Sequence, residues 1–330
     1  MADVQKQFEE FHEKIRMDYE MASELREKRE AVLKRIRKYL KDNDLPGFRE
    51  IGQGSYTMKT GTKPIEDLEY DIDVGLRFDF HEDDYTADEV RGWIYEAVKD
   101  HTQRIEKKKP CIRVAYEAGY HIDITSYAVW EENGKDQFRL ARKDTGWTPA
   151  DPPALLDYVN NFREANFEDT EDNATKTDQF RRNVRALRRW NDVRMPYDSK
   201  AKPVGLAFVL LAVQRPLTRA TFLDSRPDDR QSLATFARSV ANTLGRVVAK
   251  KPTPEYDDLF ARLTDEDMGE FKLAMGTLAD ALEFAGRTAD PVKACERLQE
   301  VFGDDFPVPE AKDTATKTRA PAIVTSSSSA

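Results

Sequence analysis

Apolar side chains recur at two different spacings along this chain, and each spacing predicts one kind of element. Over residues 4–43 they fall three or four positions apart among Glu, Lys and Arg side chains, which predicts one long amphipathic helix. Between residues 48 and 127 short runs alternate between apolar and polar positions, as in strands, around one helix expected near residues 87–103. After Pro152 the helical spacing returns and strand signals nearly vanish.

This order of elements predicts an α+β fold with a mixed-sheet lobe, a helical second lobe and a long N-terminal helix bridging them. We expect residues 1–145 to form the sheet lobe with its helix and residues 146–311 to form the helical lobe. Residues 312–330 are small and polar with little to bury, which predicts a flexible C-terminal tail. The cleft between the lobes is the expected place for an active site.

Two of the predicted strands carry carboxylates on one face of the sheet. Side chains alternate in the first, so Asp71 and Asp73 share a face, and Asp123 follows on the second, close to His121. Like charges this close require a cation, and hard oxygen ligands suit Mg²⁺ or Mn²⁺. Three such ligands can hold two cations about 3.5–4 Å apart, as in a two-metal nucleotidyl-transfer site. Coincidental surface aspartates are the alternative. We expect His121 to orient Asp123 or pack against the sheet, not to act as a general base.

A glycine-serine turn precedes the acidic strands. Its glycines let the backbone approach a ligand, so that the N–H groups around Gly54 and the hydroxyl of Ser55 can hold a phosphate. Residues 59–63 add two lysines and further hydroxyl donors. A Gly-Ser pair alone is most often an ordinary turn, so this interpretation rests on its position ahead of the three aspartates.

The helix predicted over residues 177–194 carries a row of arginines. Arg181, Arg185 and Arg188 recur at a spacing that places them on one face. Such a row would bind a triphosphate across the cleft, because guanidinium groups bind phosphates through paired hydrogen bonds. An exposed helix that pairs with acidic neighbours is the alternative. Three aromatic residues are candidates for stacking on a base, although core packing is the commoner role: Tyr56, Tyr127 and Trp147.

Together these motifs resemble the cGAS/DncV-like nucleotidyltransferases (CD-NTases), bacterial enzymes that make cyclic oligonucleotide signals in anti-phage (CBASS) defence. The resemblance is carried by residues 53–56, 71–73 and 121–124. It continues through residues 147–152 and 180–191, which look like the second lobe of the family. It implies a nucleotidyltransferase (polymerase beta-like) fold. One departure is that the segment after the arginine helix lacks the serine that family members often place near the nucleotide.

The resemblance also implies an activity, its cofactors and its partners. The enzyme would make a cyclic di- or oligonucleotide from ATP and a second nucleoside triphosphate, with two Mg²⁺ or Mn²⁺ ions held by Asp71, Asp73 and Asp123. The nucleotide would be bound by residues of the turn and of the arginine helix: Gln53, Gly54, Ser55, Arg185 and Arg188. Some members end in a tail whose last small residue is joined to other proteins by a ubiquitin-transfer-like partner, and Ala330 resembles such an end.

Charge and cysteine content argue against several other classes of protein. The chain has 52 Lys and Arg against 61 Asp and Glu, a net charge of −9, which argues against stable binding of nucleic acid. Its 2 cysteines, Cys111 and Cys295, exclude a disulfide framework and favour the reducing cytoplasm. No apolar run reaches membrane-spanning length, so we expect no membrane contact. A template-independent RNA or tRNA nucleotidyltransferase and a nucleotide-binding module without catalysis remain as alternatives.

Overall fold

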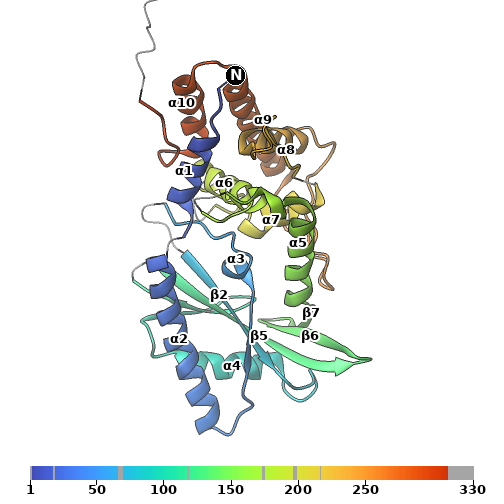
Figure 1. The fold of residues 1–330 in the computed structure, drawn as a ribbon. Coiled ribbons are helices and arrows are strands. Elements are labelled where there is room, and N and C mark those ends of the chain that lie inside the picture. The colour runs from blue at the N-terminus through green and yellow to red at the C-terminus, as the bar shows by residue number, and fades with distance from the viewer. Residues whose placement is uncertain are drawn as a thin grey trace, which may run out of the picture.

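A computed structural model describes residues 2–17, 19–65, 70–117, 119–172, 175–195, 199–215 and 217–310. The first half of the chain forms α1 (Gln5–Ile15), α2 (Tyr19–Asp42), β1 (Arg49–Ile51), α3 (Gly54–Thr57), β2 (Tyr70–Phe78), α4 (Ala87–Val98), β3 (Arg104–Lys107), β4 (Ile112–Ala115), β5 (Tyr120–Glu132), β6 (Lys135–Arg142) and β7 (Gly146–Ala150). The second half forms α5 (Pro152–Phe167), a 3₁₀ turn (Glu168–Thr170), α6 (Gln179–Arg194), α7 (Gly205–Gln214), α8 (Asp229–Ala241), α9 (Asp265–Arg287) and α10 (Pro291–Phe302). The expected α+β fold, with a mixed sheet and a helical part, is confirmed (Figure 1).

The strands form one mixed sheet in which β2 and β5 are neighbours. The order is β1-β2-β5-β4-β3, and β6 pairs with both β5 and β7. β2 and β5 run parallel, whereas the other pairs are antiparallel. The two acidic strands therefore point the same way and lie side by side, as a shared site requires.

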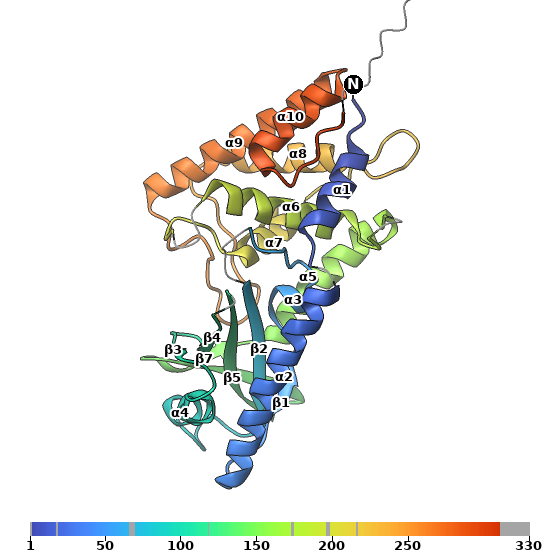
Figure 2. The same ribbon diagram turned by 90° about the vertical axis from the view of Figure 1, so that its left-hand side faces the viewer.

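One face of the sheet is covered by α2 and α4. On that face Ile72 and Val74 of β2 and Ile122 and Ile124 of β5 pack with the two helices in a buried apolar core. Because side chains alternate along a strand, the odd-numbered residues point to the opposite face. Figures 1 and 2 show α3 and the helical part of the molecule at the upper end of the sheet.

The helices from α5 to α10 pack around a second, separate apolar core. Its members include Leu187 of α6, Phe208 of α7 and Phe271 of α9. A buried ion pair lies beside this core: Arg182 donates through Nε and Nη2 to the carboxylate of Asp229, at 2.6 and 2.9 Å. A buried ion pair needs this fork geometry to offset the cost of removing both charges from water.

The N-terminal segment forms two helices, so the prediction of one long helix over residues 4–43 is wrong. α1 packs in the helical core, for example through Phe11, and α2 packs in the sheet core, for example through Ile36. Between them Arg16 forms a β-bridge with Thr62. The segment does connect both lobes, but one straight helix cannot face two separate cores. The sequence pattern misses the break because both halves are amphipathic.

Two further expectations from the sequence need correction. Residues 147–152 were expected in the second lobe, but residues 146–150 form β7, which is hydrogen-bonded to β6 in the sheet. β7 is short and contains Pro149, which weakens its strand signal. α4 ends at Val98, before the expected end near residue 103. The lobe boundaries stay a prediction, and the expected tail, 312–330, lies outside the described residues. Within the described ranges, no helix combines the length and apolar character needed to cross a membrane.

Candidate active site

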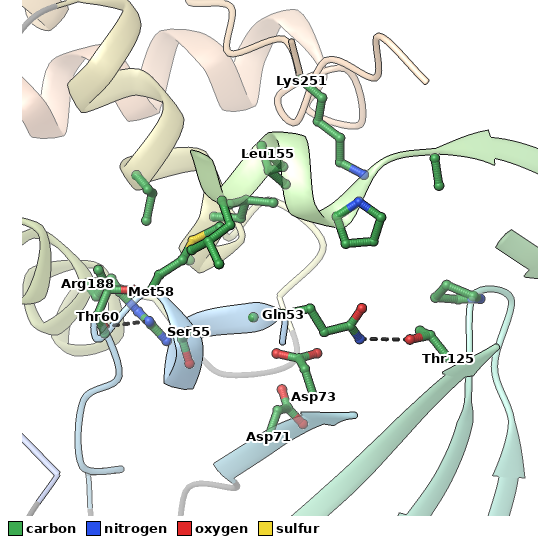
Figure 3. A pocket seen from close by; sticks show the side chains of 18 of the residues that line it. Gln53, Ser55, Met58, Thr60, Asp71, Asp73, Thr125, Leu155, Arg188 and Lys251 are labelled. Carbon is green, nitrogen blue, oxygen red and sulfur yellow. Dashed lines mark hydrogen bonds between the residues drawn. The ribbon is translucent and has the colours of Figure 1, made fainter. Parts of the chain in front are cut away.

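The three predicted aspartates meet on two adjacent strands. The parallel register of β2 and β5 sets Asp73 beside Asp123 and Asp71 beside His121. Alternation turns all three carboxylates to the sheet face that α2 and α4 leave uncovered. Asp71 and Asp73 line a cavity of about 450 Å³, and Figure 3 shows them together on one side of it. The structure therefore brings the predicted acidic residues together.

The surroundings of Asp73 disfavour its negative charge. Burial, followed by the charges of Asp123 and Asp71, raises the pKa of Asp73 to about 7, although Arg188 and Arg113 act in the opposite direction. A carboxylate whose pKa rises in this way lies where negative charge is not fully compensated. A bound divalent cation would supply the missing positive charge.

Arg113 of β4 lies within the acidic group and was not predicted as a site residue. Its Nε and Nη2 donate to Oδ1 and Oδ2 of Asp123, both at 2.7 Å, and Nη2 lies 3.1 Å from Oδ1 of Asp71. The antiparallel register places Arg113 directly opposite Asp123. A sequence signal for this residue does exist. Arg113 is an arginine inside an apolar strand, and pairing the two strands of the predicted hairpin residue by residue sets it opposite Asp123.

The glycine-serine turn packs directly against β2. Gly54 has φ +72°, and a β-carbon there would lie 1.9 Å from Oδ2 of Asp73, so only glycine fits. Gly54 opens the short helix α3, where a strand was expected to follow, and Ser55 lines the cavity. Gln53 also lines the cavity, but its amide is bonded within the protein: Nε2 donates to Thr125 at 2.7 Å, and Oε1 accepts from Tyr127 at 2.8 Å. Gln53 therefore fixes the turn to β5.

The donor set fits a hard divalent cation, because it consists of carboxylate oxygens with incompletely compensated charge. In the present arrangement, however, the described part of the chain contains no group of three or more His, Cys, Asp or Glu side chains placed to hold a metal ion. Arg113 instead provides positive charge between Asp71 and Asp123. The residues required for a metal site are present, with a guanidinium group among them.

The arginines of α6 do not line the cavity together as the triphosphate-binding row that was expected. Arg181 donates to its helix-capping neighbour Asp178 at 3.1 Å. Arg185 is buried and donates to the carbonyls of Gly61 and Lys59, at 3.0 and 2.8 Å. Arg185 is not among the residues that line the cavity. These two arginines therefore hold protein groups in this structure, and sequence spacing alone cannot distinguish a phosphate from a backbone carbonyl as acceptor.

Arg188 is the α6 arginine that lies at the cavity. Its Nη1 donates to the carbonyl of Thr60 at 2.7 Å, and its guanidinium packs on Gly205, where an added β-carbon would lie 3.0 Å from Nε. Figure 3 shows Arg188 beside Thr60 and Ser55, on the same side of the cavity as the turn. Of the expected arginines, Arg188 is placed to meet a phosphate at Ser55.

The opposite end of the cavity contains polar residues that were not predicted. Arg142 comes from the end of β6, and Lys251 and Glu255 come from the loop between α8 and α9. Figure 3 shows Lys251 across the cavity from Asp71 and Asp73. Only the folded chain brings this distant loop to the sheet, so no local sequence signal marks it.

Comparison with known proteins identifies the sheet region. The family model described as "Cyclic GMP-AMP synthase DncV-like, nucleotidyltransferase domain" matches residues 48–127. Residues 48–127 are a DncV-like nucleotidyltransferase domain. The predicted resemblance to the cGAS/DncV-like nucleotidyltransferases is thereby confirmed.

A curated relative and several solved structures extend the likeness beyond that domain. A cyclic GMP-AMP synthase of Escherichia albertii is 24% identical over 212 residues, which cover 62% of this chain and 45% of that protein. The chain thus spans about half the length of this relative. The crystal structure of Vibrio cholerae DncV cyclic AMP-GMP synthase has a TM-score of 0.75 at 15% identity and covers 93% of this chain and 98% of that one.

Two further structures show the same fold with ligands bound. A complex of Vibrio cholerae DncV with the linear intermediate 5′ pppA(3′,5′)pG has a TM-score of 0.72 at 15% identity, covering 91% of this chain and 96% of that one. The structure of CdnC of E. coli MS115-1 with ATP has a TM-score of 0.66 at 17% identity. The match covers 93% of this chain and 99% of that one. At these identities the structural likeness establishes the fold of the whole described chain.

The remaining candidate residues, one histidine and three aromatic residues, differ in their burial and in their distance from the cavity. His121 is buried beside Asp71 in the sheet. Tyr127 is buried and lines the cavity. Trp147 donates to the carbonyl of Tyr85 at 2.8 Å, and exposed Tyr56 accepts from Arg26 at 3.1 Å. Neither Trp147 nor Tyr56 lines the cavity. Of the three aromatic candidates, Tyr127 alone is placed to meet a nucleotide there.

Proposed function

We propose that this chain is a metal-dependent nucleotidyltransferase that joins nucleoside triphosphates and closes the product into a cyclic di- or oligonucleotide. The observation that carries this proposal is the meeting of Asp71, Asp73 and Asp123 on two parallel strands, with the Gly54 turn packed against Asp73. Gly54, Asp71 and Asp73 line a cavity of about 450 Å³, a size that suits a nucleotide. The activities named for the relatives support the same reading.

Each residue of the site has a distinct role in this proposal. Asp71, Asp73 and Asp123 would hold Mg²⁺ or Mn²⁺, two ions per site, which supply charge stabilisation for an attacking hydroxyl and a leaving pyrophosphate. The backbone at Gly54 and the hydroxyl of Ser55 would hold the triphosphate. Arg188, fixed by Thr60 and Gly205, would neutralise part of its charge. The contribution of the protein is then mainly positioning and charge neutralisation.

A second cavity favours a reaction that joins two nucleotides. It measures about 400 Å³ and shares four lining residues with the first cavity: Asp71, Arg188, Asp192 and Gly205. Its lining also includes three cationic residues: Lys200, Lys202 and Arg262. Two triphosphates that enter from the two cavities would meet beside Asp71, where the hydroxyl of one can reach the α-phosphorus of the other. The linear intermediate held by Vibrio cholerae DncV supports such a stepwise route.

One assay separates this function from the two alternatives. The purified chain is incubated with Mg²⁺ and four labelled nucleoside triphosphates, with and without an RNA primer, and the products are treated with phosphatase. We expect small phosphatase-resistant products, because a ring has no terminal phosphate. An extended primer would instead indicate a template-independent RNA or tRNA nucleotidyltransferase. Unchanged triphosphates, with binding retained, would indicate a module without catalysis.

The biological setting is a further part of the proposal. We propose that the product acts as a signal in anti-phage (CBASS) defence and that the enzyme works in the cytoplasm, where both cysteines would stay reduced. Cys111 and Cys295 are free and buried, in keeping with that compartment. The expected conjugation at Ala330 concerns a residue outside the described ranges and stays a prediction.

A further inference from the structure

A compact loop borders the first cavity on the side across from the aspartates. Between α8 and α9 a β-bridge joins Lys250 to Asp258, and the backbone N–H of Lys251 donates to the carbonyl of Asp257 at 2.9 Å. These bonds hold residues 250–258 in a closed turn. Lys251 and Glu255 project from this turn and line the cavity.

Lys251 and Glu255 form a fixed pair of hydrogen-bonding groups. Nζ of Lys251 donates to Oε1 of Glu255 at 3.2 Å, and the two side chains are only 17% and 11% exposed. Oε2 of Glu255 is buried and has no hydrogen-bond partner. An ionised oxygen left without a donor in such a place is costly, and a ligand that brings a donor removes that cost.

The cavity around this pair has the character of a slot for a flat ring. Besides its polar groups it is lined by apolar side chains from β6, α5 and α7: Leu140, Leu155, Leu156, Leu206 and Val209. Apolar walls with a few placed polar groups at one end are typical of sites that bind a nucleobase by packing and read its edge by hydrogen bonds. The polar groups at that end therefore decide which base fits.

We propose that Glu255, with Lys251 beside it, selects guanine as the base bound at this end of the cavity. The pair presents a donor, Nζ of Lys251, next to two acceptors, Oε1 and Oε2 of Glu255. Guanine presents the complement on one edge: the acceptor O6, then the donors N1–H and N2–H. This inference rests on the proposed function, because it assumes that the cavity takes a nucleoside triphosphate.

The other bases match this edge less well. Adenine brings one donor and then an acceptor, N1, which would face an oxygen of Glu255. Cytosine brings a donor, N4–H, to the ammonium of Lys251 and two acceptors to the carboxylate. Uracil matches at O4 and N3–H but places O2 against the second oxygen of Glu255. Leaving a buried charged acceptor unpaired, or facing another acceptor, is the strongest basis for rejecting a wrong base.

The first test uses the wild-type chain and needs no mutation. Dissociation constants are measured by calorimetry, with Mg²⁺, for α,β-non-hydrolysable analogues of GTP, ITP, ATP and UTP. Inosine differs from guanosine only in lacking the 2-amino group, so it removes one donor to Glu255. We expect the GTP analogue to bind roughly ten- to a hundredfold more tightly than the ITP analogue, as for one hydrogen bond to a charged group. Equal affinity for these two analogues, or a preference for the ATP analogue, would overturn the inference.

The second test changes the carboxylate while keeping its shape. Glu255→Gln replaces one acceptor by a donor and should abolish the preference for the GTP analogue over the ATP analogue. Tyr256→Phe is the matched control, since Tyr256 lies in the same loop, is exposed and does not line the cavity. The control should keep the preference. A Glu255→Gln chain that still prefers the GTP analogue would contradict the assignment. Failure of the wild type to bind any triphosphate would contradict the proposed function itself.

Discussion

Asp73 is the aspartate whose protonation the surroundings alter most clearly. Its pKa is raised to about 7, mainly by burial and then by Asp123 and Asp71. The turn adds to this confinement, because Gly54 lies so close that no side chain fits between them. In the absence of metal, Asp73 is therefore expected to be partly protonated near neutral pH, and its ionisation opposes folding.

The stability of the metal-free protein should depend on pH through Asp73. Its pKa is higher in the folded chain than the ordinary value of 3.8. The folded state therefore binds an extra proton between these values. Protonation of Asp73 therefore contributes up to about 4 kcal/mol to the free energy of unfolding. This contribution is complete below about pH 4 and is lost as the pH rises through 7. We expect the free energy of unfolding of Asp73→Asn, measured in urea without divalent cations, to lack this decline. Parallel pH curves for the variant and the wild type would refute the assignment.

The acidic group should be dispensable for folding and essential for chemistry. Asp71→Asn with Asp73→Asn removes two mutually repelling charges, so the double variant should fold at least as stably as the wild type. The same change should lower the rate of product formation about a thousandfold or more, roughly 4 kcal/mol of transition-state stabilisation. Circular dichroism and phosphatase-treated product assays test the two halves separately. Near wild-type turnover in a folded double variant would remove the aspartates from the mechanism.

At the scale of elements, α6 performs two tasks with neighbouring arginines. Arg185 donates to the carbonyls of Lys59 and Gly61 and does not line the cavity. Arg188 donates to the carbonyl of Thr60 and does line the cavity. Arg185 also meets Nε2 of His12, whose pKa is lowered to about 2 by burial and by the nearby arginines. Neutral His12 can therefore accept a hydrogen bond from Arg185.

The two arginines should differ when each is replaced by alanine. Arg188→Ala should raise KM for triphosphates more than it lowers kcat, because a phosphate contact is made in both the ground and transition states. Arg185→Ala should mainly lower the melting temperature, because it removes the donor to the carbonyls of Lys59 and Gly61. Steady-state kinetics and thermal unfolding of both variants provide the comparison. An unchanged KM in Arg188→Ala would assign that residue to structure alone.

These elements show which parts of the site a sequence can reveal. Alternation within β2 and β5 is a local property, so the shared face of Asp71, Asp73 and Asp123 could be predicted from spacing. The contact of Arg113 with Asp123 depends on the register of the hairpin, because a shift by one residue would turn Arg113 to the other face of the sheet. The partners of Arg185, and the arrival of Lys251 and Glu255 at the cavity, depend on packing between distant segments. The periodicity of apolar residues along the sequence does not predict such long-range contacts.

At the scale of the whole molecule, two separate cores are joined partly through the N-terminus. α1 is tied to the helical core by a polar network: Gln5 donates to Asp229 at 3.2 Å, and Asp229 also holds Arg182. These groups are all buried. The carboxylate of Asp229 therefore serves three helices, α1, α6 and α8, and adds a buried polar contact to the apolar packing of α1.

Removing that carboxylate should destabilise the helical lobe and release α1. Asp229→Ala leaves the buried charge of Arg182 with a weaker set of partners, which typically costs about 3–5 kcal/mol. We expect a matching fall in the free energy of unfolding and faster amide hydrogen exchange over residues 5–15. Asp224→Ala, at an exposed ion pair with Arg226, is the control and should change stability little. Unaltered exchange in α1 would show that apolar packing alone holds this helix.

The break between α1 and α2 has a mechanical consequence. At this joint Arg16 is bridged to Thr62, and the N–H of Lys63 donates to the carbonyl of Ile15 at 2.7 Å. The segment so attached is the one that borders the cavity and bonds Arg188. The residues that hold the joint between α1 and α2 therefore also form part of the wall of the site. A ligand that contacts this wall therefore touches the same stretch of backbone that ties the N-terminal segment to the site.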